Sequence, residues 1–222
     1  MKKIAIDGPS GAGKSTMAKL AARELGFTYV DTGAMYRALG FKALENNIEI
    51  SDADAVCKML SNTEIELKFE DGAQRIFTDG ADVSDRIRTP EVSLAASDIS
   101  ALAAVRLKMV DMQRRIANTR DVVMDGRDIG TYVLPDADVK IFLTADIDER
   151  ACRRYNELKE RGAAGVSLED VRADMERRDK NDSTREMAPL AAASDAIVLD
   201  TTGNEIPQSV ELVLNIIKGK FH

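Results

Sequence analysis

The sequence predicts an α/β fold: a five-stranded parallel sheet flanked by helices, with a small antiparallel β insertion. Three observations lead to this prediction. Short apolar runs alternate with helix-like segments along the chain, which is typical of repeated βα units. A glycine-rich loop joins the first apolar run to the first helix-like segment. Between the second and third runs lies a stretch at 62–88 in which residues 64–69 alternate polar and apolar side chains, which favours antiparallel strands.

Five apolar runs are predicted to form the parallel strands, because strands buried on both faces are nearly continuous in apolar residues. Polar residues lie at or just after the end of each run, so the strand ends are candidates for ligand contacts. The five runs cover residues 4–7, 29–32, 122–125, 140–143 and 196–200.

The segments between these runs carry the usual start and stop signals of helices. Residues 16–25 are expected to form a helix that Gly26 closes. A longer helix is expected to start after a capping Thr89, with Pro90 in its first position, and to continue to about Ile116. The last helix is expected to begin near Pro207.

Residues 62–88 are predicted to form a meander of three short strands, at residues 64–69, 75–78 and 81–83, with turns at Asp71-Gly72 and Asp79-Gly80. We therefore expect one unit of residues 1–222, with a core of residues 1–61 and 89–222 and an insertion at 62–88. The insertion either serves the site, as a monophosphate-binding element, or is a surface decoration without function.

The composition is that of an ordinary acidic globular protein, long enough for one α/β core. A net charge of −7 argues against general nucleic-acid binding, which usually needs a basic face. No apolar run reaches the roughly 18 residues of a membrane span. Cys57 and Cys152 lie far apart and are expected to be ordinary thiols of a reducing cytosol. With no exposed apolar stripe, we expect a cytoplasmic monomer that binds neither nucleic acid nor a membrane.

Histidine is almost missing: the single one is His222, the last residue. This excludes a histidine-based nucleophile triad, a histidine general base and a histidine-rich metal site. Any chemistry must therefore use lysine, arginine, aspartate, hydroxyl groups and a bound metal ion.

Residues 8–15 match the pattern G-x-x-x-x-G-K-[ST] at every constrained position, between a predicted strand and a predicted helix. The glycines let backbone N–H groups surround an anion at a helix N-terminus. Lys14 is expected to reach the β- and γ-phosphates, and the Ser15 hydroxyl to ligate Mg²⁺. We therefore predict that the chain binds a nucleoside triphosphate through Gly8, Pro9, Ser10, Gly11, Ala12, Gly13, Lys14, Ser15 and Thr16. Binding modules, switch GTPases and motors share this loop with small kinases, so the choice of a P-loop kinase fold depends on the rest of the chain.

Two further strand ends are rich in polar residues. After the second strand, Thr32 is expected to cap a helix and Arg37 follows one turn later. Arg37 either holds a second phosphate or is a surface arginine of an amphipathic helix. After the third strand, Asp125 fits an acid that holds Mg²⁺ beside Ser15. The loop 126–130 that follows is either functional or a plain turn.

An arginine-rich stretch after the fourth strand is predicted to be a lid, at residues 153–178, with a hinge at residues 162–165. Two phosphate-binding strand ends and such a lid indicate phosphoryl transfer between two nucleotides. A phosphate acceptor is already anionic, so this reaction needs alignment and charge neutralisation rather than a strong base.

Residues 6–14, 31–37, 125–130 and 182–185 resemble the bacterial cytidylate kinases, a family of the nucleoside monophosphate kinase superfamily. The likeness covers essentially the whole chain, and the insertion at 62–88 resembles the enlarged monophosphate-binding domain of that family. The resemblance implies transfer of the γ-phosphate of ATP to CMP or dCMP, which gives ADP and CDP or dCDP, with Mg²⁺ as the metal ion.

The resemblance also implies roles for single residues. It implies contacts with the acceptor phosphate from Arg37, Arg127 and Arg185. It implies contacts with the sugar from Arg178 and Asp182.

For the cytosine edge, the resemblance implies contacts from Ser97, Arg106 and Asp128, with Asp128 accepting from the exocyclic amine. Thr32 stands where relatives often have serine and also supplies a hydroxyl to the substrate. Arg153 of the lid is expected to contact ATP. The residues expected to be catalytic are Lys14, Arg127, Asp128 and Arg185.

Two other functions remain open at this point. The first is a kinase for another monophosphate or for a small alcohol, for which Asp7 or Asp31 would be the base. The second is a non-enzymatic nucleotide switch, although the N-K-x-D pattern of guanine-binding switches is missing from the sequence.

Overall fold

The computed structural model describes residues 1–70, 73–160, 162 and 165–221. The turn expected at Asp71 and Gly72 lies outside the described residues, as do Ala163 and Ala164 of the expected hinge. The helices are α1 (Lys14–Leu25), α2 (Thr32–Glu45), α3 (Ala53–Ser61), α4 (Pro90–Ile99), α5 (Ala103–Thr119), α6 (Ile147–Glu160), α7 (Leu168–Thr184) and α8 (Ile206–Phe221), with short helical turns at Arg86–Arg88 and Ile129–Val133.

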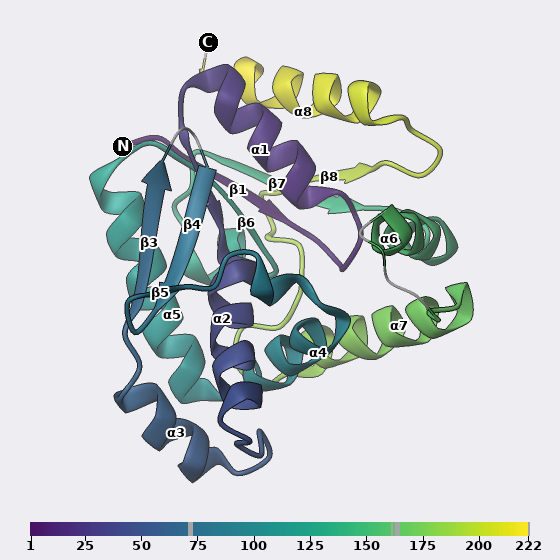
Figure 1. Cartoon of the computed structure of the whole chain (residues 1–222). Helices are drawn as coiled ribbons and strands as arrows, with labels where there is room; N and C mark the ends of the chain where they lie inside the picture. Colours follow the sequence, from purple (N-terminus) through teal and green to yellow (C-terminus); the bar gives the residue numbers. More distant parts are fainter. Residues whose placement is uncertain (71–72, 161, 163–164, 222) are drawn as a thin grey trace.

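A parallel sheet of five strands in the order β2-β6-β1-β7-β8 forms the centre of the described structure (Figure 1). All five predicted runs form parallel strands, but the burial on both faces expected of the run at 196–200 is wrong, because this run forms an edge strand and Ile197 and Val198 are exposed. The strands are β1 (Lys3–Asp7), β2 (Thr28–Asp31), β6 (Val122–Gly126), β7 (Val139–Thr144) and β8 (Ile197–Asp200). In the register of this sheet, Asp125 of β6 lies opposite Asp31 of β2, and Asp7 of β1 lies opposite Gly126. The polar ends of these three strands therefore meet at one edge of the sheet.

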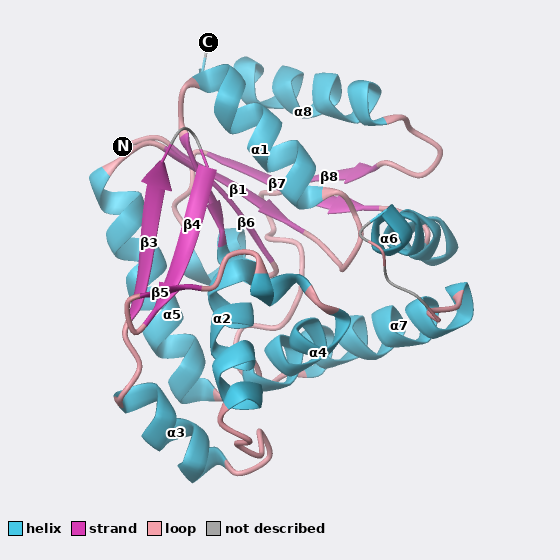
Figure 2. Ribbon diagram, in the orientation of Figure 1, coloured by secondary structure: helices cyan, strands magenta, loops and turns pink. Residues whose placement is uncertain are grey.

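Helices cover both faces of the sheet (Figure 2). Ile4 and Ile6 of β1 point to the face covered by α1 and α8, where they pack with Met17 and Val213. Ala5, one residue out of phase, points to the opposite face, which packs against α5. Both faces of β1 are therefore buried, which is why its sequence is continuously apolar rather than alternating.

The single helix expected from Thr89 to about Ile116 is wrong, because the chain forms α4 and α5 with a break at residues 100–102. The predicted start is confirmed: Thr89 caps α4 and Pro90 is at its first turn. At the other end, the Ser100 hydroxyl donates to the carbonyl of Ser97 at 2.8 Å. Such local bonds favour a helix end, and Leu102 leaves the helical region with ψ near 121°. The break lets α4 pack on α2 while α5 returns to the sheet.

The small antiparallel sheet is built from β3 (Ile65–Glu70), β4 (Ala73–Thr78) and β5 (Ala81–Asp82), in that order. This confirms the antiparallel insertion predicted from the period of two. Ile65 and Ile76 are buried in an apolar cluster with Met35 and Leu39 of α2. The sheet is thus attached to the core by its own apolar face.

Helices α6 and α7 form a separate pair that includes the residues of the expected lid. They pack on each other through Ala151, Leu158, Val171 and Met175. Gly162 and Gly165, which lie between them, both have positive φ, near 80° and 78°. Among the helices that the structure describes, none combines the length and apolar character that a membrane crossing requires.

Candidate active site

A cavity of about 610 Å³ opens at the carboxyl ends of the strands, and residues of α6 and α7 also line it. It brings together nearly all the site residues that the sequence predicts. Gly8 and Pro9 do not line it, since they form the base of the phosphate loop. The predicted residues that line it are Ser10, Gly11, Ala12, Gly13, Lys14, Ser15, Thr16, Thr32, Arg37, Ser97, Arg106, Asp125, Arg127, Asp128, Arg153, Arg178, Asp182 and Arg185.

The phosphate loop curls around its own lysine. Gly11 and Gly13 adopt positive φ, and Gly13 leads into α1, so the loop ends at a helix N-terminus as predicted. The Lys14 ammonium donates to the carbonyl of Pro9 at 2.6 Å and is buried. Burial, with the charge of Arg127 nearby, lowers the pKa of Lys14 to about 7. A bound polyphosphate would supply the negative charge that favours the protonated amine.

Gly8→Ala is expected to disrupt this loop and lower the free energy of unfolding by about 3 kcal/mol or more. Gly8 has φ near +146°, and an added Cβ would lie 1.9 Å from the carbonyl oxygen of Leu143. Thermal unfolding measures the loss. The matched control is Gly219→Ala in α8, where a Cβ meets nothing within 4 Å. That change should raise stability by about 0.5–1 kcal/mol. An unchanged Tm for Gly8→Ala would contradict this description of the loop.

Ser15 and Asp125 lie side by side, as the magnesium prediction requires. The Ser15 hydroxyl donates to Oδ2 of Asp125 at 2.8 Å, and the Tyr29 hydroxyl donates to Oδ1 at 3.0 Å. Burial raises the pKa of Asp125 to about 6. Among the described residues no cluster of three or more acidic, cysteine or histidine side chains forms a metal site. One hydroxyl and one carboxylate still fit Mg²⁺, because this ion usually takes its other ligands from phosphates and water.

The end of β2 orients the second predicted phosphate ligand. The cap expected at Thr32 is wrong: Asp31 is the cap of α2, and its Oδ1 accepts from the Ala34 N–H at 2.8 Å. Thr32 is the first helical residue, and its hydroxyl donates to the Asp125 carbonyl at 2.6 Å. Asp31 rather than Thr32 is the cap because the carboxylate of Asp31 reaches the free N–H groups of the first helical turn.

Arg37 is held by the other oxygen of the same carboxylate, with its terminal nitrogen 2.9 Å from Oδ2 of Asp31. Burial alone would raise the pKa of Asp31, but Arg37 and the Ala34 N–H outweigh it and lower that pKa. The Nε–H of Arg37 is buried and finds no hydrogen-bond partner in the described part of the chain. This guanidinium therefore keeps an unused donor at the cavity, as a phosphate ligand would.

A network of buried charges forms the opposite wall. Asp128 forms an ion pair with Arg106 through Oδ2 and lies 3.3 Å from Arg185 through Oδ1. The Nε–H of Arg127 donates to Asp182 at 2.8 Å. Because each carboxylate joins arginines from different elements, the network ties β6 and α5 to α7 and the segment after it.

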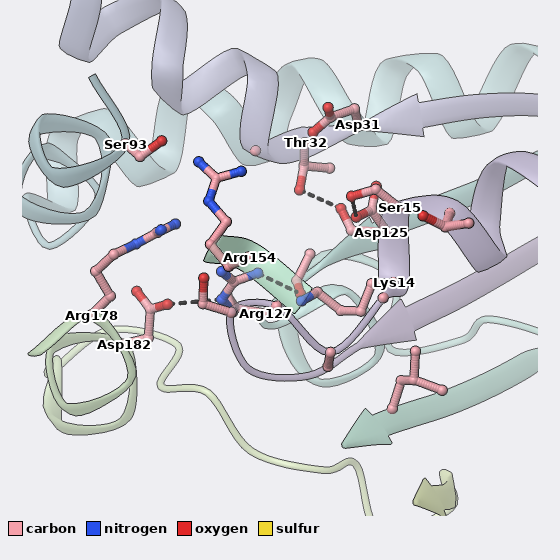
Figure 3. A pocket seen from close by; sticks show the side chains of 18 of the residues that line it. Lys14, Ser15, Asp31, Thr32, Ser93, Asp125, Arg127, Arg154, Arg178 and Asp182 are labelled. Carbon is pink, nitrogen blue, oxygen red and sulfur yellow. Dashed lines mark hydrogen bonds and ion pairs between the residues drawn. The ribbon is translucent and has the colours of Figure 1, made fainter. Parts of the chain in front are cut away.

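Figure 3 shows Arg127, Arg154 and Arg178 around one space at the centre of the cavity. Burial, together with the nearby charge of Arg127, lowers the pKa of Arg178 to about 10. No described residue accepts from the buried Nε–H of Arg178. Three arginines facing one space, with a donor unused, make this region suitable for an anion.

Asp7 holds the backbone of the loop after β6, a role that its position in the sequence did not reveal. Its two carboxylate oxygens accept from the N–H groups of Ile129 and Gly130, at 2.8 and 2.7 Å. Burial raises the pKa of Asp7 to about 7. Because Asp7 does not line the cavity, and Asp31 is paired with Arg37, neither carboxylate is placed as the base that an alcohol kinase would need.

The lid arginines divide differently from the prediction. Arg153 lines the cavity, but its guanidinium donates to the Thr201 carbonyl at 2.8 Å and pairs with Glu149. Arg154, the next residue, faces the central space and lies 2.8 Å from Glu157. Sequence reasoning also missed Tyr36, Arg88 and Ser93 as lining residues. Arg153 and Arg154 are the same residue type, so only their different positions around the helix could have shown which of them faces the central space.

Arg150 and Asp179 join α6 and α7 to the phosphate loop. Asp179 of α7 accepts from the Ser10 N–H at 3.0 Å and from Arg150 of α6 at 2.6 Å. Arg150 in turn donates to the Ser10 carbonyl at 2.9 Å. A shift of α6 or α7 would therefore be transmitted directly to the backbone of the loop.

Comparison with known proteins identifies close relatives. A family model described as "Cytidylate kinase" matches residues 4–219. The protein named "Cytidylate kinase" of Desulfitobacterium hafniense is 53% identical over 223 residues, which covers 99% of this chain and 95% of that protein. The one of Caldicellulosiruptor bescii is 51% identical over 218 residues, or 97% and 96% of the two chains.

A solved structure shares the fold at low sequence identity. An uncharacterized protein from Eubacterium ventriosum is 14% identical, with a TM-score of 0.54, and the match covers 98% of this chain and 99% of that chain. At this identity the likeness concerns the fold alone.

Proposed function

The chain belongs to the cytidylate kinase family, and on that premise we propose how its cavity transfers the γ-phosphate of ATP to CMP. One observation carries the proposal: a phosphate loop and a second set of cations from other elements face the same cavity. Lys14 marks the donor side, and Arg37 and Arg127 mark the acceptor side. A triphosphate and a monophosphate can therefore meet between them.

The donor ATP lies with its phosphates on residues 8–16. Its adenosine contacts Arg153, which lines the cavity together with Thr201 and Asn204. Ser15 and Asp125 would hold Mg²⁺, which would supply positive charge to neutralise the phosphates during transfer. Lys14 contacts the transferred group and stabilises the charge that builds up during transfer.

The acceptor phosphate lies against Arg37, Arg127 and Arg185. A phosphate oxygen attacks without help from a strong base, because it is already ionised near neutral pH. Arg154 adds positive charge around the group in transfer, and closure of α6 over it excludes water as a competing acceptor.

Recognition of cytosine rests on Ser97, Arg106 and Asp128. The Ser97 hydroxyl is buried and has no hydrogen-bond partner among the described residues, so it is available to the base. Asp128 accepts from the exocyclic amine of cytosine. Uracil presents an acceptor oxygen at that place, which a carboxylate repels, so UMP is disfavoured. Arg178 and Asp182 contact the sugar, and both CMP and dCMP are accepted.

The proposal extends to the state of the protein in the cell: a cytoplasmic monomer that binds neither nucleic acid nor a membrane. The net charge of −7 disfavours nucleic acid. Cys57 and Cys152 are free thiols, which suits a reducing compartment.

An ADP-release assay with a panel of acceptors tests the proposed function. CMP and dCMP should support turnover well above UMP, dTMP, AMP and shikimate. Fast release with AMP or shikimate would favour a kinase for another acceptor. ADP release at the same rate with no acceptor would favour an ATPase or a nucleotide switch.

Asp125→Asn is expected to raise the Mg²⁺ concentration for half-maximal activity by about 10-fold or more. The amide keeps the shape but loses the charge that attracts the cation, and its NH₂ group cannot ligate a metal. Turnover is measured against Mg²⁺ at fixed ATP. The control is Asp121→Asn, a carboxylate just before β6 that accepts from the Lys2 N–H on the surface. An unchanged Mg²⁺ dependence in Asp125→Asn would remove this residue from the metal site.

A further inference from the structure

Gln74 of β4 joins the small β3–β5 sheet to Asp31, a residue that lines the cavity. Its Oε1 accepts from the backbone N–H of Asp31 at 2.9 Å, and its Nε2 donates to the Asp31 carbonyl at 3.2 Å. Of the two ways to place the amide group, only this one satisfies both bonds. Gln74 thus pairs with both backbone groups of the last residue of β2.

This pairing completes an edge of the parallel sheet. In the described residues β2 pairs with β6 on one side only, so the outward backbone groups of Asp31 have no strand to bond. A side-chain amide carries one donor and one acceptor, as a neighbouring strand would present. Gln74 takes the place of that strand at the point where β2 ends and α2 begins.

Asp31 is also the residue that holds Arg37. One carboxylate oxygen caps α2 and the other lies 2.9 Å from the Arg37 guanidinium. Space around this pair is small: a Cβ added to Gly33 would lie 2.9 Å from Arg37 and 3.2 Å from the Asp31 carboxylate. The position of Arg37 therefore follows from the position of Asp31.

We propose that Gln74 is a positioning residue for the acceptor phosphate: it fixes Asp31 and, through it, the guanidinium of Arg37. This inference rests on the proposed function, in which Arg37 binds the phosphate of CMP. This role would make the inserted sheet contribute to catalysis, because Gln74 would position an active-site residue without itself lining the cavity. Gln74 itself does not line the cavity.

A role limited to attaching the small sheet explains the contact less well. The sheet is already anchored by Ile65 and Ile76, which are buried against α2. Gln74, by contrast, is only half-buried and has its two bonds at the one residue that orients Arg37. Losing the Gln74 amide leaves the apolar anchor in place.

The test compares Gln74→Ala with Arg75→Ala, its neighbour on the same strand. Arg75 bonds Asp82 and Asp85 within the insertion, so it controls for a general loosening of the small sheet. For Gln74→Ala the KM for CMP should rise about tenfold, while the KM for ATP stays within about twofold. For Arg75→Ala both KM values should stay near those of the unaltered protein. Gln74→Met, which keeps the length without the polar atoms, should behave like Gln74→Ala and covers the case in which alanine unfolds the sheet.

A double-variant cycle separates this inference from the function on which it rests. If Gln74 acts through Arg37, then Gln74→Ala should add no further loss of kcat/KM in an Arg37→Ala background. Full additivity, or an equal rise of both KM values in Gln74→Ala and Gln74→Met, overturns the positioning role. If instead Arg37→Ala alone leaves the KM for CMP unchanged, the proposed role of Arg37 fails.

Discussion

Replacing Lys14 by alanine is expected to lower kcat at least about 10³-fold while the protein stays folded. The Lys14 ammonium lies inside the phosphate loop and, in the proposed mechanism, contacts the phosphoryl group during transfer. With no histidine before residue 222, charge neutralisation must come from lysine, arginines and the metal ion. Losing one such charge in a buried site removes stabilisation that water cannot replace.

Initial rates at saturating ATP and CMP measure this loss, and circular dichroism checks that the fold survives. Lys14 bonds only Pro9 of its own loop among the described hydrogen bonds, so the truncation removes little structure. Lys19→Ala is the matched control, because it removes an exposed lysine from the same helix. Turnover of Lys14→Ala close to that of Lys19→Ala would rule out the phosphate-loop mechanism.

Asp128→Ala is expected to lower kcat/KM for CMP about 10²-fold, and that for UMP less than about fivefold. The carboxylate of Asp128 is buried between Arg106 and Arg185. Its oxygens have about four lone-pair positions, so about two remain for the cytosine amine after both arginines are bound. Only cytosine has a donor there, so only CMP should lose the bond.

The alanine variant also leaves two buried guanidinium groups without their shared partner, which costs about 3–5 kcal/mol. Asp128→Asn is therefore assayed beside it, since the amide keeps the shape and one acceptor oxygen. Asp128→Asn should lower kcat/KM for CMP less than Asp128→Ala does. It should still reduce the preference for CMP over UMP. Asp111→Ala, which breaks a surface ion pair on α5, serves as the control. Equal losses for CMP and UMP in both variants would remove Asp128 from base recognition.

The elements that the sequence predicted well are those set by local patterns. The five parallel strands are continuous in apolar residues, and the loop at 8–15 has a fixed spacing, so each is visible without its neighbours. The break between α4 and α5 was missed because apolar periodicity continues across it. What ends α4 there is a side-chain bond of Ser100, which a count of apolar positions does not register.

The parts of the site that the sequence missed depend on contacts between distant residues. Asp7 bonds Ile129, which lies 122 positions away in the sequence, and the next residue, Gly130. Gln74 bonds Asp31, which lies 43 positions away. In the sequence, Asp7 is merely the polar end of a strand and Gln74 an unremarked polar residue of a β hairpin. Three-dimensional pairing, rather than residue type, gives each of them its role in the structure.

Binding of a bisubstrate compound, in which five phosphates join adenosine to cytidine, tests most directly that one cavity holds both nucleotides. Calorimetry should show one molecule bound per chain. Inhibition kinetics should show competition with ATP and also with CMP, because the compound occupies the donor side at Lys14 and the acceptor side at Arg37. Competition with ATP alone, or two molecules bound per chain, would contradict a single site for direct transfer.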